Sequence, residues 1–220
     1  MKLSVLIPVF NEGDSIGELL QRVHAVPLET EIIVVDDHST DGTADVLAAL
    51  DFKNVAVVTH PENRGKGAAI RTALAVATGD VVVIQDADLE YSPNDFIAMS
   101  EPIARGRAKV VYGFRDLSDQ ERVRRWGNQL LTFATNLLYG SRLRDMETCY
   151  KMVDLELMRS LDLRADRFEI EVEITAKLLK GRHEIVQVPV AYHPRLERKL
   201  VPWIDGPHSL WTIIKYRFLK

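Results

Sequence analysis

Five apolar runs rich in valine and isoleucine constrain the fold of this chain more than any other feature. They span residues 3–9, 31–35, 55–59, 80–84 and 109–114. Continuous runs of this length are typical of strands covered on both faces, because a half-exposed strand alternates apolar and polar residues. Segments with helical spacing separate them, at residues 14–26, 43–50, 68–78 and 94–104. This alternation predicts an α/β fold with a Rossmann-like, mostly parallel sheet and helices on both faces.

The pattern changes after the fifth run. Residues 119–139 and 169–180 have helical spacing, and 155–161 predict a short helix. Residues 145–154 begin as a loop and continue into a strand, and 183–191 predict another strand. Periodicity is then lost until residues 207–219, where aromatic and aliphatic residues are interspersed with basic ones. There we expect an amphipathic C-terminal helix.

Charged clusters follow the first four apolar runs. They are PVFNE at 8–12, DDHSTDG at 36–42, NRGKG at 63–67 and DADLE at 86–90. In parallel α/β sheets, ligands bind outside the carboxyl ends of the strands. The topology alone therefore gathers these clusters on one rim, which we interpret as functional rather than as a set of ordinary turns.

Asp86 and Asp88 end the fourth run one residue apart, so their side chains point the same way beyond the strand. Two carboxylates so close repel each other unless a cation joins them. Oxygen ligands suit Mg²⁺ or Mn²⁺, which often take substrate phosphates as further ligands. A lone D-x-D often only caps a turn. In this charged setting we predict a metal-bridged diphosphate.

Two of the neighbouring clusters indicate more specific roles for their residues. Asp36 or Asp37 at the second strand end is positioned to contact a nucleoside, while Asp41 suits the cap of the next helix. NRGKG lacks the spacing and the Ser or Thr of a nucleoside-triphosphatase loop, and no dinucleotide G-x-G-x-x-G is present. We expect Gly65 and Gly67 to permit close helix packing, with Asn63 or Lys66 near the ligand.

Composition limits the function class. The chain has 220 residues, a net charge of −4 and an ordinary globular make-up, which argues against nucleic acid as a partner. One cysteine excludes an intramolecular disulfide and fits a reducing compartment. No secretory signal or spanning segment is recognisable, so we expect a cytoplasmic protein.

Taken together and in order, PVFNE, DDHSTDGT, NRGKGAAI and QDADLEY resemble the family 2 glycosyltransferases with the GT-A fold. DMETCYK, DRFEIEVEITAK, VPVAYHPR and the final WIDGPHSLWTIIKYRF resemble the bacterial dolichol-phosphate mannose synthase branch. The resemblance implies a catalytic domain over residues 1–192, with a nucleotide-sugar half at 1–115 and an acceptor half at 116–192. Residues 193–220 would form a basic acceptor loop and a membrane-facing helix.

The resemblance also implies roles for individual residues. Phe10 replaces the usual Tyr of the family's P-x-Y-x-E, which removes one hydroxyl contact. Leu196 and Arg198 depart from the usual residues of the acceptor loop. Nucleotide-sugar contacts are expected at Pro8, Phe10, Glu12, Val35, Asp37, Lys66, Asp86 and Ala87; metal ligands at Asp86, Asp88 and Glu90; and acceptor contacts at Arg195, Arg198 and Lys199.

We expect catalysis to involve Asp88, Arg115 and Asp145. The metal and Arg115 would neutralise the departing nucleoside diphosphate, and the resemblance implies inversion at the sugar. A hydroxyl acceptor needs a general base. The resemblance makes Asp145 the first candidate and Glu147 the second. A phosphate acceptor is largely an anionic nucleophile at neutral pH, so Asp145 would then orient the acceptor or a basic side chain instead.

The basic loop and the apolar groups after it favour a polyprenyl-phosphate acceptor at a membrane surface. These apolar groups are Trp203, Trp211, Ile213, Ile214, Tyr216 and Phe218, and an ordinary packed terminal helix explains them equally well. The predicted activity is transfer of mannose or glucose, from GDP-mannose or UDP-glucose, to polyprenyl or dolichyl phosphate, by an enzyme peripheral to the inner face of the cell membrane. Transfer to a hydroxyl acceptor and an inactive nucleotide-sugar-binding protein are the alternatives, and a nucleotidyltransferase is a weaker one.

Overall fold

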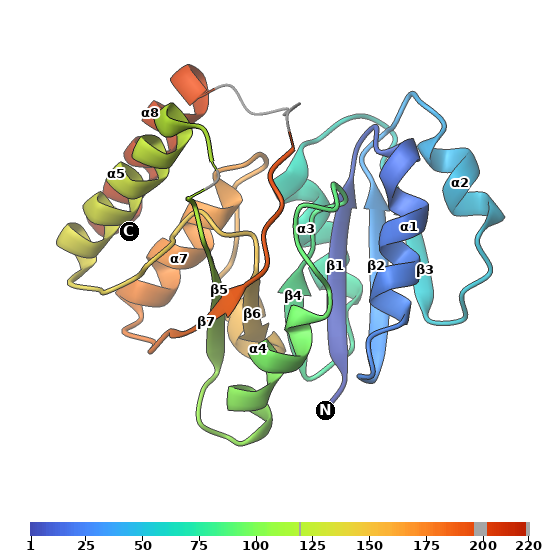
Figure 1. Ribbon diagram of the computed structural model, residues 1–220, viewed down its shortest axis with the longest axis horizontal. Coiled ribbons are helices and arrows are strands. Elements are labelled where there is room, and N and C mark those ends of the chain that lie inside the picture. Colours follow the sequence, from blue (N-terminus) through green and yellow to red (C-terminus); the bar gives the residue numbers. More distant parts are fainter. Residues whose placement is uncertain (119, 196–201, 219–220) are drawn as a thin grey trace.

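The computed structural model describes residues 1–118, 120–195 and 202–218, and it contains a seven-stranded sheet with helices on both faces (Figure 1). The strand order is β3-β2-β1-β4-β6-β5-β7. The strands are β1 (Leu3–Val9), β2 (Thr30–Asp36), β3 (Val55–Thr59), β4 (Val81–Ile84), β5 (Val110–Arg115), β6 (Lys151–Asp154) and β7 (Val186–Val190). The helices are α1 (Gly13–His24), α2 (Thr43–Ala49), α3 (Lys66–Val76), α4 (Asp95–Ala104), α5 (Arg122–Tyr139), α6 (Leu155–Ser160), α7 (Ile170–Lys180) and α8 (Pro202–Phe218).

Strands β3, β2, β1 and β4 pair in parallel, as the alternating sequence pattern predicted. The sheet is mixed because β6 lies antiparallel between β4 and β5. Strand β7 then adds in parallel to β5 at the edge. A chain segment from the second half of the sequence is thereby inserted beside β4, the strand that leads to the paired aspartates.

Each strand of the centre contributes to two apolar layers, which explains its continuous apolar sequence. On β1, Val5 and Ile7 face the layer formed with α1 and α4, whereas Leu6 faces the layer formed with α3, α6 and α7. Strand β3 differs from the prediction of strands covered on both faces. It is the edge strand, and the Val57 side chain is 45% exposed.

A third apolar cluster lies beyond the end of the sheet, where α5 and α8 pack beside α7 (Figure 1). It joins Leu131 of α5, Val172 of α7 and Ile213 of α8. Helix α8 starts at Pro202, earlier than the sequence pattern indicated. No helix within the described ranges is both long enough and apolar enough to cross a bilayer.

The glycines of the 63–67 segment allow two chain segments to touch. Gly65 has a φ of +96°, and the amide of Ala68 donates to the carbonyl of Asp166 over 3.1 Å. A Cβ atom added to Gly67 would collide with the backbone at Ala165. The first turn of α3 therefore packs against the loop that leads into α7. Glycine permits this close packing because it has no Cβ atom.

This close approach predicts opposite effects for two Gly→Ala substitutions within helices. Gly67→Ala should lower the free energy of unfolding by about 2–4 kcal/mol, because backbone has to move to admit the methyl group. Gly127 of α5 has open space around its Cα, so Gly127→Ala should stabilise the protein by about 0.5–1 kcal/mol through helix propensity. Urea denaturation of both variants measures the difference, and equal effects would contradict the packing described here.

Candidate active site

The loops after β1 and β2 are bound to each other at the carboxyl ends of the strands. The Asn11 amide donates to Ser39 Oγ over 2.9 Å, and the Glu12 amide donates to Thr43 Oγ1 over 2.9 Å. The Ser15 hydroxyl, from the start of α1, donates to the Ala87 carbonyl over 2.7 Å. The clusters that follow β1, β2 and β4 thus meet at one rim, as the topology predicted.

Three carboxylates follow β4 on this rim, and their charges are only partly neutralised. Lys66 Nζ lies 2.6 Å from Asp86 Oδ1 and 2.5 Å from Glu171 Oε1. Burial, reinforced by the charges of Asp86 and Glu90, raises the pKa of Asp88 to about 7. The site therefore has excess negative charge at the point where the sequence predicts a cation.

Glu90 holds the segment that follows β7. Its carboxylate accepts hydrogen bonds from the Tyr192 hydroxyl over 3.0 Å and from the Arg195 amide over 2.8 Å. The Arg195 guanidinium in turn lies 2.9 Å from Glu12 Oε2. Arg195 is therefore on the rim, between two acidic residues, and its role as an acceptor contact stays a prediction. Arg198 and Lys199, predicted to share this role, lie outside the described residues.

Arg115 and Asp145 form a buried ion pair. Arg115 Nε donates to Asp145 Oδ2 over 2.6 Å, and Nη2 donates to Oδ1 over 2.9 Å. Their side chains are 6% and 2% exposed. The Arg115 guanidinium also lies 5.0 Å from the centre of the Tyr192 ring. From the sequence, Asp145 was expected to act as a base or to orient the acceptor or a basic side chain, and here it orients the side chain of Arg115. A catalytic role of either residue stays a prediction.

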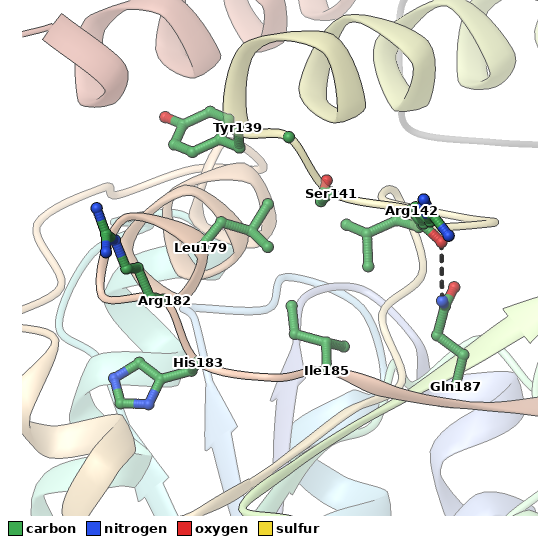
Figure 2. Close-up of a pocket in the computed structure, with 10 residues that line it drawn as sticks. Tyr139, Ser141, Arg142, Leu179, Arg182, His183, Ile185 and Gln187 are labelled. Atoms are coloured by element: carbon green, nitrogen blue, oxygen red, sulfur yellow. Dashed lines mark hydrogen bonds between the residues drawn. The ribbon is translucent and has the colours of Figure 1, made fainter.

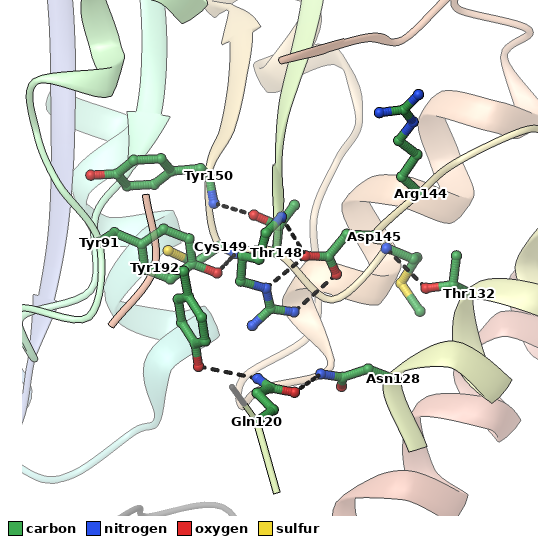
Figure 3. Close-up of polar contacts among 12 residues, drawn as sticks. Tyr91, Gln120, Asn128, Thr132, Arg144, Asp145, Thr148, Cys149, Tyr150 and Tyr192 are labelled. Atoms are coloured by element: carbon green, nitrogen blue, oxygen red, sulfur yellow. Dashed lines mark hydrogen bonds and ion pairs between the residues drawn. The ribbon is translucent and has the colours of Figure 1, made fainter. Parts of the chain in front are cut away.

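Tyr192 is a junction between the two halves of the chain, which Figure 3 shows. Its hydroxyl accepts from Gln120 Nε2 over 3.3 Å, and Gln120 Oε1 accepts from Asn128 of α5 over 3.2 Å. Tyr91 packs against Tyr192 with ring centres 5.2 Å apart. Sequence analysis missed Tyr192, because an aromatic residue after a strand gives no local sign of the groups it contacts.

Glu147 is partly exposed, but one of its carboxylate oxygens is buried and unsatisfied. This Oε1 has no hydrogen-bond partner among the described residues. Burial, with the nearby charge of Glu171, raises the pKa of Glu147 to about 7. Lys151, four residues further along the chain and fully buried, instead donates to the carbonyls of Met146 and Thr148. Glu147 thus combines a geometry and a pKa that are typical of an acid–base group.

Two of the expected nucleotide contacts have structural partners. Asp37 Oδ1 accepts from His60 Nδ1 and from the Arg64 amide, and Oδ2 accepts from the Gly65 amide over 2.7 Å. Asp37, which is 3% exposed, therefore holds the 63–67 loop, and its expected contact with a nucleotide stays a prediction. The Val35 side chain is 0% exposed and lies in the core, so the expected nucleotide contact of Val35, which stays a prediction, would have to come from its backbone.

Asp86 and Asp88 are hard oxygen donors that fit a divalent cation. Burial is the main cause of the raised pKa of Asp88, and the charges of Asp86 and Glu90 add to it. Glu90 does not complete a ligand set in this arrangement, because its oxygens face Tyr192 and Arg195. Within the described ranges, no three acidic, histidine or cysteine side chains converge as metal ligands.

A separate surface pocket lies away from this rim (Figure 2). It has a volume of about 440 Å³ between the end of α5 and the end of α7. Tyr139, Ser141, Arg142, Arg182 and His183 are among its lining residues, and it shares none with the acidic cluster. Figure 2 shows Arg142 and Arg182 on opposite sides of the pocket, so they do not converge on one ligand.

Comparison with known proteins identifies the family. Residues 4–161 match the model of "Glycosyl transferase family 2". The chain belongs to glycosyl transferase family 2. PVFNE, DDHSTDGT, NRGKGAAI, QDADLEY and DMETCYK lie within this matched region, whereas DRFEIEVEITAK, VPVAYHPR and WIDGPHSLWTIIKYRF lie beyond it.

Named relatives of this family 2 chain include two lipid-phosphate sugar transferases. Undecaprenyl-phosphate 4-deoxy-4-formamido-L-arabinose transferase of Pseudomonas fluorescens is 37% identical over 150 residues, which cover 65% of this chain and 44% of that protein. Dolichol-phosphate mannosyltransferase of Pyrococcus furiosus is 28% identical over 204 residues, covering 87% of this chain and 56% of that protein. The chain spans about half the length of the curated relatives it matches.

A solved structure with the same fold is glucosyl-3-phosphoglycerate synthase of Mycobacterium tuberculosis, in complex with Mg²⁺ and UDP. The TM-score is 0.78 at 23% identity, with 98% of this chain and 79% of that one covered. At this identity the match shows the fold alone, and it confirms the expected α/β fold class of the GT-A type.

The crowded carboxylates predict a conflict between stability and ligand binding at Asp88. Asp88→Asn removes one of three adjacent negative charges, so it should raise the melting temperature of the ligand-free protein at pH 8. The same change should abolish the further stabilisation by Mn²⁺ with a nucleoside diphosphate. Thermal unfolding with and without both ligands measures the two effects. Asp80→Asn, at the opposite end of β4, is the control that should leave the ligand effect intact. A destabilised Asp88→Asn that keeps its response to ligands would contradict the placement of the site.

Proposed function

We propose that this chain is a metal-dependent, inverting glycosyltransferase that moves a hexose from a nucleotide diphosphate sugar to a polyprenyl phosphate. The observation that carries the proposal is the cluster of three carboxylates at the end of β4, in which the pKa of Asp88 is raised to about 7. A group of like charges on a ligand-binding rim is costly to keep unless a bound cation offsets it. The names of the two lipid-phosphate transferases support the choice of acceptor.

Asp86 and Asp88 are the residues that would hold Mg²⁺ or Mn²⁺. When bound, the cation stabilises the negative charge of the departing nucleoside diphosphate. Lys66 adds a positive charge 2.6 Å from Asp86 and keeps that carboxylate oriented. Asp37 fixes the 63–67 loop and thereby the position of Lys66. Pro8, Phe10 and Glu12, from the end of β1 and the loop after it, complete the proposed donor side.

The Arg115–Asp145 pair supports a phosphate acceptor. An aspartate that accepts two charge-assisted hydrogen bonds is a poor general base, because protonation would break both. A phosphate monoester is already largely ionised at neutral pH and needs no base. Arg195, placed between Glu12 and Glu90, offers a cation to such an acceptor. Asp145 then holds Arg115, and the Arg115 guanidinium contacts Tyr192 on the proposed acceptor side of the rim.

Glu147 supports a second candidate, transfer to a hydroxyl acceptor. Its unsatisfied Oε1 and its pKa of about 7 suit a group that removes a proton near neutral pH. In this case Glu147 replaces Asp145 as the base that the sequence suggested first.

A transfer assay separates the two acceptors. A panel of nucleotide sugars that includes GDP-mannose and UDP-glucose is tested with a short, water-soluble prenyl phosphate and with the matching prenyl alcohol. We expect product only from the phosphate, and only with Mn²⁺ or Mg²⁺ present. Product from the alcohol alone would select the second candidate. Absence of transfer and of donor hydrolysis from every sugar nucleotide would contradict the proposed function.

Two conservative variants distinguish Asp145 from Glu147. If the reaction needs no base, Glu147→Gln should keep the rate of transfer to the prenyl phosphate within a few-fold of wild type. If the reaction needs Glu147 as a base, the rate should fall by about 10²-fold or more, as expected for a missing base. Asp145→Asn leaves the buried Arg115 charge without its partner, and should destabilise the protein by about 3 kcal/mol or more. Initial rates and urea denaturation measure the two outcomes.

The raised pKa of Glu147 also predicts a pH dependence of stability. The folded-state pKa of about 7 exceeds the ordinary 4.5, so the folded protein binds the extra proton and stability falls as the pH rises between these values. Glu147→Gln removes this loss. Its melting temperature should match wild type near pH 4.5 and exceed it at pH 8, by an amount equivalent to roughly 2–3 kcal/mol. An equal difference at both pH values would contradict the burial of an ionisable Glu147.

A further inference from the structure

The ammonium of Lys66 lies between two carboxylates that come from distant parts of the chain. Its Nζ is 2.6 Å from Asp86 Oδ1, just after β4, and 2.5 Å from Glu171 Oε1, in the first turn of α7. The Lys66 and Glu171 side chains are each 11% exposed. The centre of the Phe168 ring lies 5.8 Å from Nζ. The ammonium is therefore largely shielded from solvent, where charges interact more strongly than at an exposed surface.

The charge of this ammonium acts on both proposed metal ligands. It contacts Asp86 directly, and at Asp88 it opposes the rise in pKa that burial, Asp86 and Glu90 cause. A lysine ammonium is a compact charge on a flexible four-carbon stem, so it can take the place of another cation. Lys66 can therefore compete with Mg²⁺ or Mn²⁺ for the same carboxylates.

The backbone on both sides of Lys66 is fixed, so the place of Nζ depends on the side chain. Asp37 Oδ2 accepts a hydrogen bond from the Gly65 amide over 2.7 Å. On the other side, the Ala68 amide donates to the Asp166 carbonyl over 3.1 Å. The side chain between these anchors has four rotatable bonds, and the groups around its tip decide where the ammonium comes to rest.

Glu171 lies in a helix turn that is held firmly against α3. Ile174 of α7 and Ile70 of α3 are both 0% exposed and belong to one apolar layer. In the same turn as Glu171, Glu173 accepts a hydrogen bond over 2.7 Å from the amide of Ala165, in the loop that packs against α3. The Glu171 carboxylate therefore has a fixed position from which to hold the ammonium.

The balance between the two carboxylates decides where the ammonium stays. Burial alone would lower the pKa of Lys66, but the charges of Asp86 and Glu171 raise it well above its ordinary value, so the side chain remains charged. A charged group without Glu171 beside it would be drawn toward the point of greatest negative charge, which lies between Asp86 and Asp88. With Glu171 present, the ammonium stays at Oδ1, on one edge of the Asp86 carboxylate.

We propose that Glu171 is a positioning residue that keeps the Lys66 ammonium out of the divalent-cation site formed by Asp86 and Asp88. Glu171 acts through Lys66 and does not itself bind the cation. This inference rests on the proposed function, because it takes Asp86 and Asp88 as the metal ligands. It gives α7, a helix of the predicted acceptor half, control over metal binding in the donor half.

Mn²⁺ binding tests this role without any transfer reaction. Each protein is titrated with Mn²⁺, alone and with UDP or GDP, and free Mn²⁺ is followed by electron paramagnetic resonance. Glu171→Gln keeps the size of the side chain and removes its charge. The ammonium should then move onto the metal ligands, and the affinity for Mn²⁺ should fall about tenfold, within the range of couplings between residues in contact. Glu171→Asp keeps the charge and should lose less affinity than Glu171→Gln.

The matched control removes a neighbouring charge that holds no cation. Glu169 lies at the start of the same helix, and its carboxylate has no ion-pair partner among the described residues. Glu169→Gln should leave the affinity for Mn²⁺ within about twofold of wild type, because a charge away from the site is largely screened. Equal losses in Glu169→Gln and Glu171→Gln would overturn the proposal.

A Lys66→Met background separates an effect through Lys66 from a direct effect of the Glu171 charge. Lys66→Met removes the competing ammonium, so Lys66→Met/Glu171→Gln should bind Mn²⁺ as tightly as Lys66→Met alone. The same loss of affinity from Glu171→Gln in both backgrounds would overturn the proposal, because Glu171 would then act on the metal by its own charge. No loss from Glu171→Gln in the wild-type background would overturn it as well.

The crystal structure of metal-free Glu171→Gln gives a second, direct readout. Nζ of Lys66 should lie within about 3 Å of carboxylate oxygens of both Asp86 and Asp88. An ammonium that keeps its wild-type position would overturn the proposal. Thermal unfolding confirms that each variant is folded at the temperature of the titration. Wild type that binds no Mn²⁺, either alone or with UDP or GDP, would contradict the proposed function rather than the role of Glu171.

Discussion

Repulsion among the carboxylates that follow β4 is the constraint on which the rest of the site depends. Asp86, Asp88 and Glu90 occupy alternate positions of one short turn, and each has a different form of compensation. Asp86 has the ammonium of Lys66, and Glu90 has the Tyr192 hydroxyl and the Arg195 amide. The Asp88 carboxylate accepts a hydrogen bond from the Glu90 amide, and its pKa is raised to about 7. A bound cation would offset the negative charge of Asp88 that these neighbouring residues leave uncompensated.

The same site links segments that are far apart in the sequence. Lys66 at the start of α3 reaches Glu171 at the start of α7, and Arg115 at the end of β5 holds Asp145 in the loop before β6. Asp37 holds the loop that leads to Lys66. A structural and a functional role therefore coincide at several residues. This overlap explains why residues that appear catalytic by position, such as Asp145, have their polar atoms directed at the protein itself.

Local sequence patterns were sufficient for the elements and the rim but not for the side-chain pairing. Apolar runs predict strands β1 to β5, and chain topology places the charged clusters after the first four of them on one rim. Both predictions depend on short-range spacing. The partner of Asp145 depends on a contact across 30 residues, and the burial of Val35 depends on α3 packing over it. No short-range pattern encodes either contact.

Helix α5 shows the same limit in another form. Its spacing predicted a helix, and Trp126 and Leu131 both belong to its apolar set. Periodicity cannot tell which apolar face a neighbouring helix will cover. Only the packing of α7 and α8 shows that Leu131 is buried at 8% exposure while Trp126 remains 75% exposed.

The position of a bound cation tests the central claim most directly. Crystals grown with Mn²⁺ and a nucleoside diphosphate are measured at a wavelength where manganese scatters anomalously. The account predicts a single anomalous peak within about 2–2.5 Å of carboxylate oxygens of Asp86 and Asp88, in contact with the diphosphate. A nucleotide bound on this rim without such a peak, or a peak at another place, would contradict it.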